Sequence, residues 1–284
     1  MYEIVKKVYL NDSVIEIVVK APLIAKRIKP GQFVILRVKK GGERIPLTVN
    51  SFDKEQGTIG LIFQTVGSTT KEMASLNEGD FLRDCVGPLG KPTETDGYKK
   101  VAIVGGGVGC AIALPVCKKF KDKGATVHAV VGFRNKDLII LKDRFLENSH
   151  LYKLMTDDGS AGEKGLVTDA LKELIEDGNE YDCVFVFGPL IMMKFVSELT
   201  KKYGIKTIVS MNPIMIDGTG MCGGCRLTVD NEIRFACVDG PDFDGHKVDF
   251  DECINRNKMY DKTSCAYHKA TCSLLKADIK ENDK

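Results

Sequence analysis

The sequence predicts a multidomain α/β plus β protein: an antiparallel β-barrel, a doubly wound domain with a parallel sheet, and a small C-terminal domain organised by cysteines. Three observations predict this fold class. Short alternating runs fill the first third of the chain, strands and helices alternate through the middle, and three cysteines lie within sixteen residues near the end. We expect these domains over residues 1–97, 98–210 and 211–250, with a polar surface tail over 251–284.

The composition is that of an ordinary soluble protein. Of the 284 residues, 43% are hydrophobic and 28% are charged, which is enough apolar material for more than one core. The 41 basic and 39 acidic residues give a net charge of +2 without a long block of one sign, so we expect no nucleic-acid partner. The N-terminus lacks the apolar core of a signal peptide, and no apolar run has the length of a membrane span. We therefore expect a cytoplasmic protein without a membrane partner.

The first part of the chain contains short runs in which apolar and polar residues alternate, as they do in half-buried strands. Turn signals such as Lys-Pro-Gly at 29–31 separate these runs. Short strands at such spacing are typical of an antiparallel barrel. The clearest runs cover residues 14–20, 32–38, 46–52 and 58–66.

The pattern changes at Lys100, where an apolar strand runs into glycines. A helix to about Lys123 and a second strand follow, and strand, helix and strand in this order imply a parallel sheet. The same alternation then repeats, which predicts a doubly wound domain. The later elements are expected as strands within 151–160, 181–189 and 205–212 and helices at 164–178 and 190–204.

The glycine-rich turn after this first strand is a candidate nucleotide site. N–H groups at the start of the following helix can meet a pyrophosphate, although the signal alone is weak. The usual dinucleotide fingerprint needs a third glycine where Cys110 stands, and no acidic residue clearly ends the next strand. This departure argues against a simple dehydrogenase fold, but a nicotinamide site at the carboxyl edge of the sheet remains compatible. Cys110 is a candidate to line that site, while a buried structural role is commoner for such a cysteine and is expected for Cys85, Cys117 and Cys183.

The most informative segment runs from Asp217 to Cys237. Asp217, Cys222, Cys225 and Cys237 are separated by four, two and eleven residues. Plant-type [2Fe–2S] proteins place four cysteines at a similar spacing, and here only the first position differs. Thiolates are soft donors that suit iron, and the surrounding glycines let the backbone fold tightly around a cluster. A carboxylate has the same single charge as a thiolate, so the segment predicts a [2Fe–2S] cluster with three Cys ligands and one Asp ligand.

Alternatives stay open for this segment. In one alternative, Asp217 is a turn residue and Cys253 is the fourth ligand. Paired cysteines are also typical of structural zinc sites, which would make the chain a non-catalytic binding module. A disulfide framework is disfavoured in a chain without an export signal. No role is predicted for Cys253, Cys265 or Cys272.

In their order, these parts resemble the ferredoxin–NADP reductase superfamily, in the branch that includes the electron-transfer subunit of dihydroorotate dehydrogenase. Several strings also look like the small subunits of NADH-dependent reduced ferredoxin:NADP oxidoreductases, which are also described as sulfide dehydrogenase beta subunits. The resemblance covers nearly the whole chain. It is carried by ERIPLTV at 43–49, GGGVGC at 105–110, TDDGSAGEKGLVTD at 156–169, MIDGTGMCGGC at 215–225 and FACVDGPDFDGHKVDFDE at 235–252.

The resemblance implies that the barrel binds FAD and that the parallel-sheet domain binds NAD(H). The segment from Arg44 to Thr48 resembles the family's Arg-x-aromatic-Ser/Thr strand. Leu47 stands in the aromatic position, and Arg44 lies one residue before the position of the family's arginine. Its Val-Gly-x-x-Thr turn and Gly-Pro-x-x-Met element are also present, although a helix cap and a helix start explain these residues equally well. The implied FAD-binding residues are Arg44, Pro46, Leu47, Thr48, Phe63, Val66, Gly67, Ser68, Thr69 and Thr70. The implied nicotinamide-site residues are Gly105, Gly106, Gly107, Val108, Gly109, Cys110, Gly188, Pro189 and Met192.

For function, the resemblance implies hydride exchange between NAD(H) and FAD and single-electron transfer through the cluster. The expected partner is a larger flavin and iron–sulfur subunit that binds NADP(H), in a heterodimer that couples NADPH, NAD and ferredoxin by flavin-based electron bifurcation. No side-chain acid, base or nucleophile is needed, so no catalytic residue is predicted. The alternative is an electron-transfer subunit of a dihydroorotate dehydrogenase or of a sulfide or sulfite reductase complex.

Overall fold

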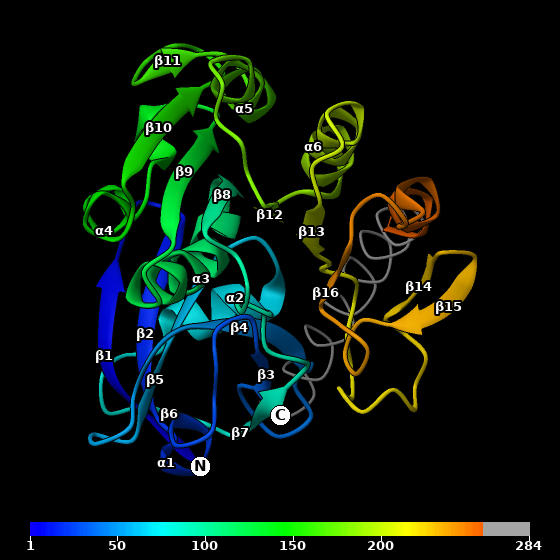
Figure 1. Cartoon of the computed structure of the whole chain (residues 1–284). Coiled ribbons are helices and arrows are strands. Elements are labelled where there is room, and N and C mark those ends of the chain that lie inside the picture. The colour runs from blue at the N-terminus through cyan, green and yellow to red at the C-terminus, as the bar shows by residue number, and fades with distance from the viewer. Residues whose placement is uncertain (258–284) are drawn as a thin grey trace, which may run out of the picture.

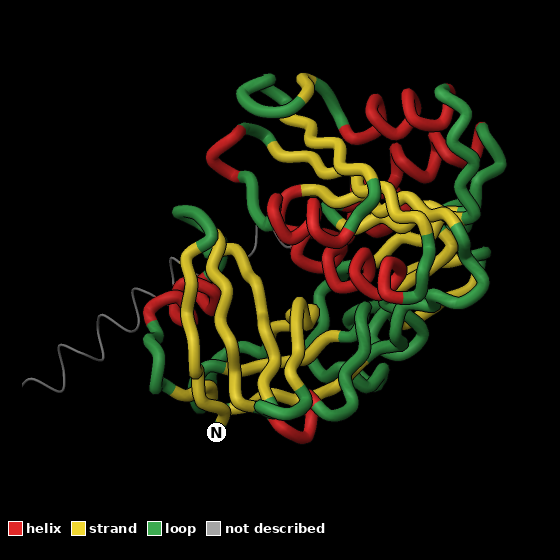
Figure 2. The backbone as a smooth tube through the Cα atoms, turned by 60° about the vertical axis from the view of Figure 1, so that its left-hand side comes forward, coloured by secondary structure: helices red, strands yellow, loops and turns green. Residues whose placement is uncertain are grey.

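A computed structural model of the chain describes residues 1–257 and confirms the predicted fold class (Figure 1). The first part is a seven-stranded antiparallel sheet in the order β6-β1-β2-β5-β4-β3-β7, whose strands stand side by side in Figure 2. Its inner face buries aliphatic side chains such as Ile17, Val34 and Leu61. The elements are β1 (Tyr2–Tyr9), β2 (Val14–Lys20), α1 (Pro22–Ala25), β3 (Phe33–Arg37), β4 (Ile45–Asp53), β5 (Thr58–Gln64), α2 (Ser68–Ser75), β6 (Phe81–Leu82) and β7 (Asp84–Leu89).

The second part is a sheet in the order β11-β10-β9-β8-β12-β13-β16, parallel except for its last strand. Helices α3 and α4 pack in one hydrophobic core, and α5 and α6 pack in another, on the opposite face of the sheet. The elements are β8 (Lys100–Gly106), α3 (Cys110–Asp122), β9 (Thr126–Phe133), α4 (Lys142–Asn148), β10 (Leu151–Thr156), β11 (Glu163–Lys164), α5 (Val167–Glu176), β12 (Cys183–Phe187), α6 (Leu190–Lys202), β13 (Thr207–Ser210) and β16 (Asp242–Asp244). Two 3-10 turns cover Gly107–Gly109 and Lys136–Leu138.

The cysteine-rich part differs from the expectation in two ways. Besides a hairpin of β14 (Arg226–Val229) and β15 (Glu232–Phe235), it contributes β16, which pairs antiparallel with β13 at the edge of the second sheet. The polar stretch from Asp251 is not simply a surface tail, because residues 250–257 are helical and bury Cys253. Apolar side chains spaced along that helix outweigh its polar composition. Cys265 and Cys272 lie outside the described residues.

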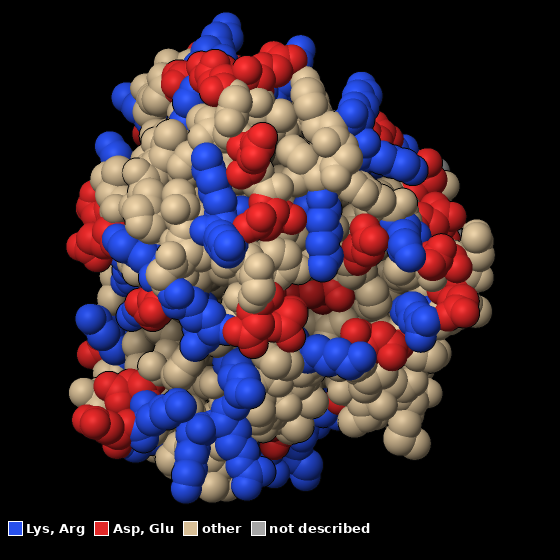
Figure 3. All heavy atoms as spheres, viewed as in Figure 1, with Lys and Arg blue, Asp and Glu red and all other residues tan. Residues whose placement is uncertain are grey.

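The surface agrees with the expected charge balance. On the face in Figure 3, basic and acidic side chains are interspersed over most of the area. None of the helices in residues 1–257 is long and apolar enough to cross a membrane.

An ion pair between a buried carboxylate and a partly exposed arginine joins the barrel to the second domain. Arg144 of α4 donates to both carboxylate oxygens of Glu16 on β2, at 3.0 and 2.7 Å. The Glu16 side chain is 7% exposed and the Arg144 side chain 44% exposed. Val14 and Ile62 of the barrel also belong to the core around α3. An ion pair and apolar packing therefore join the two domains.

A single buried carboxyl group joins all three parts. Asp242 of β16 accepts a hydrogen bond from Thr93 Oγ1 in the segment after the barrel (2.5 Å) and interacts with Ser210 at the end of β13. Its Oδ1 has no hydrogen-bond partner within the described structure. Burial raises the pKa of Asp242 to about 6, because a charge is poorly solvated there.

The Glu16–Arg144 pair gives the first prediction. Arg144→Met leaves a buried carboxylate unpaired, so we expect the free energy of unfolding to fall by about 2 kcal/mol, less than for a fully buried pair because Arg144 is partly exposed. Glu16→Gln combined with Arg144→Met should recover part of this loss. Chemical denaturation measures it. Lys247→Met, which breaks the exposed pair with Asp230, is the control, and an equal loss there would contradict the assignment.

Asp242 gives a pH-dependent prediction. The pKa of Asp242 is higher in the folded than in the unfolded protein. Its ionisation therefore lowers the free energy of unfolding as the pH rises from about 4 to about 6, and above pH 6 this loss of stability stays constant. Asp242→Asn should therefore gain stability relative to the wild type across this window, by on the order of 1–3 kcal/mol. Denaturation at several pH values measures the difference, and a difference that does not vary with pH would count against a neutral Asp242.

Candidate functional site

The glycine-rich turn lies at a switch point of the parallel sheet. β8 pairs with β9 on one side and with β12 on the other, and Gly105 of β8 lies opposite Phe187 of β12. The helices that lead into these two neighbours of β8 lie on opposite faces of the sheet, so the carboxyl ends of β8 and β12 are where a crevice is expected. Ligands of doubly wound proteins bind in such crevices.

The structure brings the two predicted nicotinamide elements together. A Cβ on Gly106 would lie 2.4 Å from Met192 Sδ, and a Cβ on Gly109 would lie 2.4 Å from the Phe187 carbonyl oxygen. A Cβ on Gly188 would lie 3.3 Å from the Cα atom of Gly106. Only glycines permit this approach of the loop at 105–109 to the loop at 188–192.

One glycine of the turn faces open space. Gly107 has a φ of +53°, which favours glycine, and no atom lies within 4 Å of its missing Cβ. Val108 beside it is partly exposed. This side of the turn has room for a dinucleotide to approach the backbone.

Two candidate cofactor-binding residues turn inward instead. The Cys110 side chain is fully buried beneath the turn, and burial raises its pKa, so its thiol does not line the crevice. Phe63 is buried in the barrel core. Cys85, Cys117 and Cys183 are also buried, which raises the pKa of each to about 12 and keeps them as thiols.

The two predicted FAD elements lie next to each other on the barrel. Pro46, Leu47 and Thr48 are partly exposed on β4, and Arg44 is exposed just before the strand. Thr69 Oγ1, at the start of α2, donates to Glu43 Oε2 beside Arg44 (2.8 Å). The strand and the helix start can therefore act on one ligand.

The start of α2 also has its own cap. Thr70 Oγ1 accepts hydrogen bonds from the N–H groups of Val66 (3.1 Å) and Gly67 (3.0 Å), so the Thr70 hydroxyl serves as a capping group. Val66, Gly67 and Ser68 are exposed around it. The capping explanation thus holds for Thr70, and the exposed backbone at Ser68 remains available for a ligand.

Asn50 is a site residue that the sequence reasoning missed. It is the extra residue of a β-bulge in β4, between Val49 and Ser51, and is buried. Its Nδ2 donates to the carbonyl oxygen of Ala111 in the first turn of α3 (2.6 Å). Asn50 therefore joins the predicted FAD strand to the helix that follows the glycine turn. In the sequence, the only signal for a special role of Asn50 is that it is a lone amide within the apolar run at 46–52.

In the cluster segment, two of the predicted ligands meet directly. The sulfurs of Cys225 and Cys237 are 3.2 Å apart and buried. Burial and the neighbouring Cys225 raise the pKa of Cys237, so thiolates at this position need a bound cation. The N–H of Cys237 points at Cys225 Sγ (3.4 Å) and the N–H of Gly224 points at Cys222 Sγ (3.5 Å), as N–H groups do around iron–sulfur clusters.

The other two predicted ligands lie in the exposed loop beside this pair. Asp217 accepts hydrogen bonds from the N–H groups of Thr219 (2.9 Å) and Cys222 (2.8 Å), which lower its pKa and keep it ionised. An aspartate in a turn forms the same hydrogen bonds, so the alternative in which Asp217 is only a turn residue stays open. Within residues 1–257, no three His, Cys, Asp or Glu side chains converge as a metal site. Cys253 shares the buried core of Cys225 and Cys237.

The segment nevertheless fits a [2Fe–2S] group. It offers a buried thiol pair, an exposed thiol and an ionised carboxylate in one loop, and N–H groups directed at two sulfurs. Three glycines of the loop, at 218, 220 and 223, have φ values of +77°, +84° and +65°. These left-handed turns let the backbone wrap closely around a ligand.

The loop of the predicted cluster packs on the barrel near the predicted FAD strand. A Cβ on Gly218 would lie 2.6 Å from Leu89 Cδ1 and 2.9 Å from Ile35 Cδ1. Ile35 of β3 is the cross-strand partner of Pro46 on β4. The loop that follows Asp217 is therefore separated from the predicted flavin strand by a single strand.

Comparisons with known proteins agree with this geometry. Residues 212–249 match the family described as the iron–sulfur cluster binding domain of dihydroorotate dehydrogenase B. The dihydroorotate dehydrogenase B (NAD(+)) electron transfer subunit homolog of Thermotoga maritima is 47% identical, over 91% of each chain. The electron transfer subunit of that name from Caldanaerobacter subterraneus is 34% identical, over 79% of this chain and 89% of the relative.

Solved structures show the same architecture. A structure of the NADH-dependent reduced ferredoxin-NADP oxidoreductase, described for its insights into flavin-based electron bifurcation, matches with a TM-score of 0.89. The two sequences are 44% identical, and the match covers 95% of this chain and 97% of that one. A ferredoxin NADP+ reductase from Neisseria gonorrhoeae with bound FAD and NADP, 18% identical, matches in fold with a TM-score of 0.58, over 72% of this chain and 91% of that one. The chain therefore belongs to the family of dihydroorotate dehydrogenase B electron-transfer subunits and their homologues, and it has the fold of a ferredoxin NADP+ reductase.

Proposed function

We propose that this chain is the electron-transfer subunit of an oxidoreductase complex, in which it exchanges hydride between NAD(H) and FAD and passes single electrons through a [2Fe–2S] cluster. The observation that carries the proposal is the contact of Gly218 with Ile35. It sets the cluster loop one strand from the FAD strand, while Asn50 joins that strand to the nicotinamide crevice. Electrons thus have a short path across the chain.

The proposed role of the side chains is to bind and to orient. A bound flavin accepts a hydride and releases single electrons, so the protein needs no acid or base for that conversion. Thr48, Ser68 and the exposed backbone of α2 are positioned to hold FAD. The glycines at 105–107 and 109, with Pro189 and Met192, are positioned to hold the nicotinamide nucleotide near it.

For the cluster, we propose Asp217, Cys222, Cys225 and Cys237 as ligands. Cys225 and Cys237 already form a close pair, and the other two lie in the adjoining loop. Movement of this exposed loop on loading would bring the carboxylate and the Cys222 thiolate to the metal. Cys253, which is buried in the core, is the competing fourth ligand.

For the reaction, we propose flavin-based bifurcation with a larger flavin and iron–sulfur subunit that binds NADP(H) and serves ferredoxin. The 44% identity to the NADH-dependent reduced ferredoxin-NADP oxidoreductase structure supports this choice. The names of the sequence relatives favour a second candidate, the electron-transfer subunit of a dihydroorotate dehydrogenase. A sulfide or sulfite reductase complex is a further alternative partner.

Isolation of the native complex tests the proposed reaction. We expect a second flavin and iron–sulfur subunit to co-purify, and NADPH oxidation to reduce NAD only when ferredoxin is reduced as well. Dihydroorotate-dependent reduction of NAD by the complex, without NADPH activity, would establish the second candidate instead. A chain that purifies without any partner would contradict both.

Asp217→Ala tests the oxygen ligand. Loss of one ligand should reduce cluster content and abolish or alter the EPR signal of the reduced cluster, whereas Asp217→Cys should keep a [2Fe–2S] cluster with a changed spectrum. Asp230→Ala, an exposed carboxylate in the same domain, is the control. An EPR spectrum of Asp217→Ala identical to that of the wild type would remove Asp217 from the ligand set, and Cys253→Ala would then be the next variant.

Gly107→Ala tests the nicotinamide crevice. The new methyl group would occupy the open side of the turn, so we expect the KM for NADH to rise about tenfold, equivalent to about 1.4 kcal/mol of binding, while FAD content stays unchanged. Gly124→Ala is a matched control, because Gly124 also has a positive φ, +82°, and open space around it, but lies beyond the far end of α3. Equal changes in KM for both variants would show that backbone strain, and not the ligand, is responsible.

A further inference from the structure

The helix at 250–257 is attached to the strand that follows the cluster loop. The N–H of Asp249 donates to the carbonyl oxygen of Thr228 on β14 (3.0 Å), and the N–H of Thr228 donates to Glu252 Oε2 (3.0 Å). Cys253 anchors the helix in the core that contains Cys225. The helix therefore holds a fixed position next to the predicted cluster.

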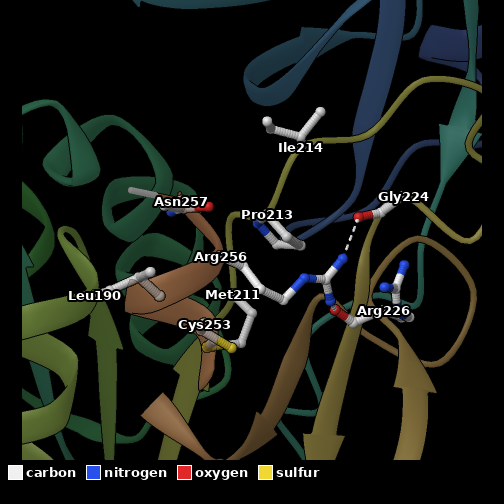
Figure 4. Close-up of a pocket in the computed structure, with 9 residues that line it drawn as sticks. All are labelled: Leu190, Met211, Pro213, Ile214, Gly224, Arg226, Cys253, Arg256 and Asn257. Atoms are coloured by element: carbon white, nitrogen blue, oxygen red, sulfur yellow. Dashed lines mark hydrogen bonds between the residues drawn. The ribbon is translucent and has the colours of Figure 1, made fainter. Parts of the chain in front are cut away.

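Arg256, one turn after Glu252, reaches from this helix to the cluster loop (Figure 4). Its Nη1 donates to the carbonyl oxygen of Arg226, and its Nη2 donates to that of Gly224 (3.3 Å). These two carbonyl groups flank Cys225. The Arg256 side chain is only 22% exposed, and Glu252 Oε1 lies 3.8 Å away as a weak partner.

We infer that Arg256 is a positioning residue that raises the reduction potential of the cluster, and that Glu252 opposes it. This inference rests on the proposed function, because it requires a [2Fe–2S] cluster at Cys225. Reduction adds one electron to the cluster, and a nearby fixed cation stabilises the added charge. An arginine stays charged at any working pH and holds two carbonyl groups at once, which suits it to this role.

Burial decides which of the nearby charges matters. Arg226 also contacts the loop, through the Gly223 carbonyl oxygen (3.3 Å), and Arg234 lies on the neighbouring strand β15. Both side chains are exposed, so water and salt screen their charges. Arg256 is shielded and points along the loop, and contacts of this kind tune metal centres through their ligands.

The test is an EPR-monitored redox titration of the full chain with its cofactors. Wild type is compared with R256Q, R256K, E252Q and the control R234Q, after iron and sulfide analysis has established the cluster content of each. We expect the midpoint potential to move to more negative values in R256Q and to more positive values in E252Q. R234Q should have the midpoint potential of the wild type. R256K keeps the charge, so its midpoint potential should lie nearer to that of the wild type than the midpoint potential of R256Q does.

Several results would overturn the inference. One is an R256Q variant that has its full cluster content and the same midpoint potential as the wild type. Another is a shift of the midpoint potential with the same sign in R256Q and E252Q, because a merely structural role would not depend on the sign of the charge removed. Should R256Q fail to assemble a cluster, E252Q decides, and the absence of a positive shift rejects the electrostatic role. A wild-type chain without any [2Fe–2S] signal would instead reject the proposed function itself.

Discussion

The contact of the cluster loop with the barrel is the constraint on which the proposed electron path depends. Gly218 approaches Ile35 and Leu89 so closely that no side chain fits between them. The neighbouring connections preserve this contact: the N–H of Lys91 donates to the Gly240 carbonyl oxygen (2.7 Å), and Thr93 donates to Asp242. Because electron transfer requires a short and fixed separation, the three parts must act as one packed unit.

The same unit places the predicted nicotinamide elements next to the predicted FAD strand. Asn50 joins β4 to α3, and the pair of Glu16 and Arg144 joins β2 to α4 on the same side. These contacts fix the glycine turn relative to Thr48, where hydride transfer is proposed.

Much of the fold could be predicted, because its signals are local. Alternation of apolar residues marked the strands of the barrel, and the glycines at 105–109 marked the strand-to-helix turn. The cysteine spacing marked the iron–sulfur domain, which the family match over 212–249 confirms. The ligand set and the domain boundaries remain predictions.

What the sequence could not show depends on contacts between distant residues. No local pattern indicates that β16 completes the sheet of the second domain, that Phe63 and Cys110 face inward, or that the helix at 250–257 docks on the cluster loop. The decisive measurement of the whole path begins with the oxidised chain, free of oxygen, to which NADH is then added. NADH gives two electrons to FAD as a hydride, and one of these electrons can pass on to the cluster while the other stays on the flavin. We predict that the EPR signal of the reduced cluster appears, with no more than one cluster reduced per NADH oxidised. Full reduction of the flavin by excess NADH while the cluster stays oxidised would contradict an electron path through this chain.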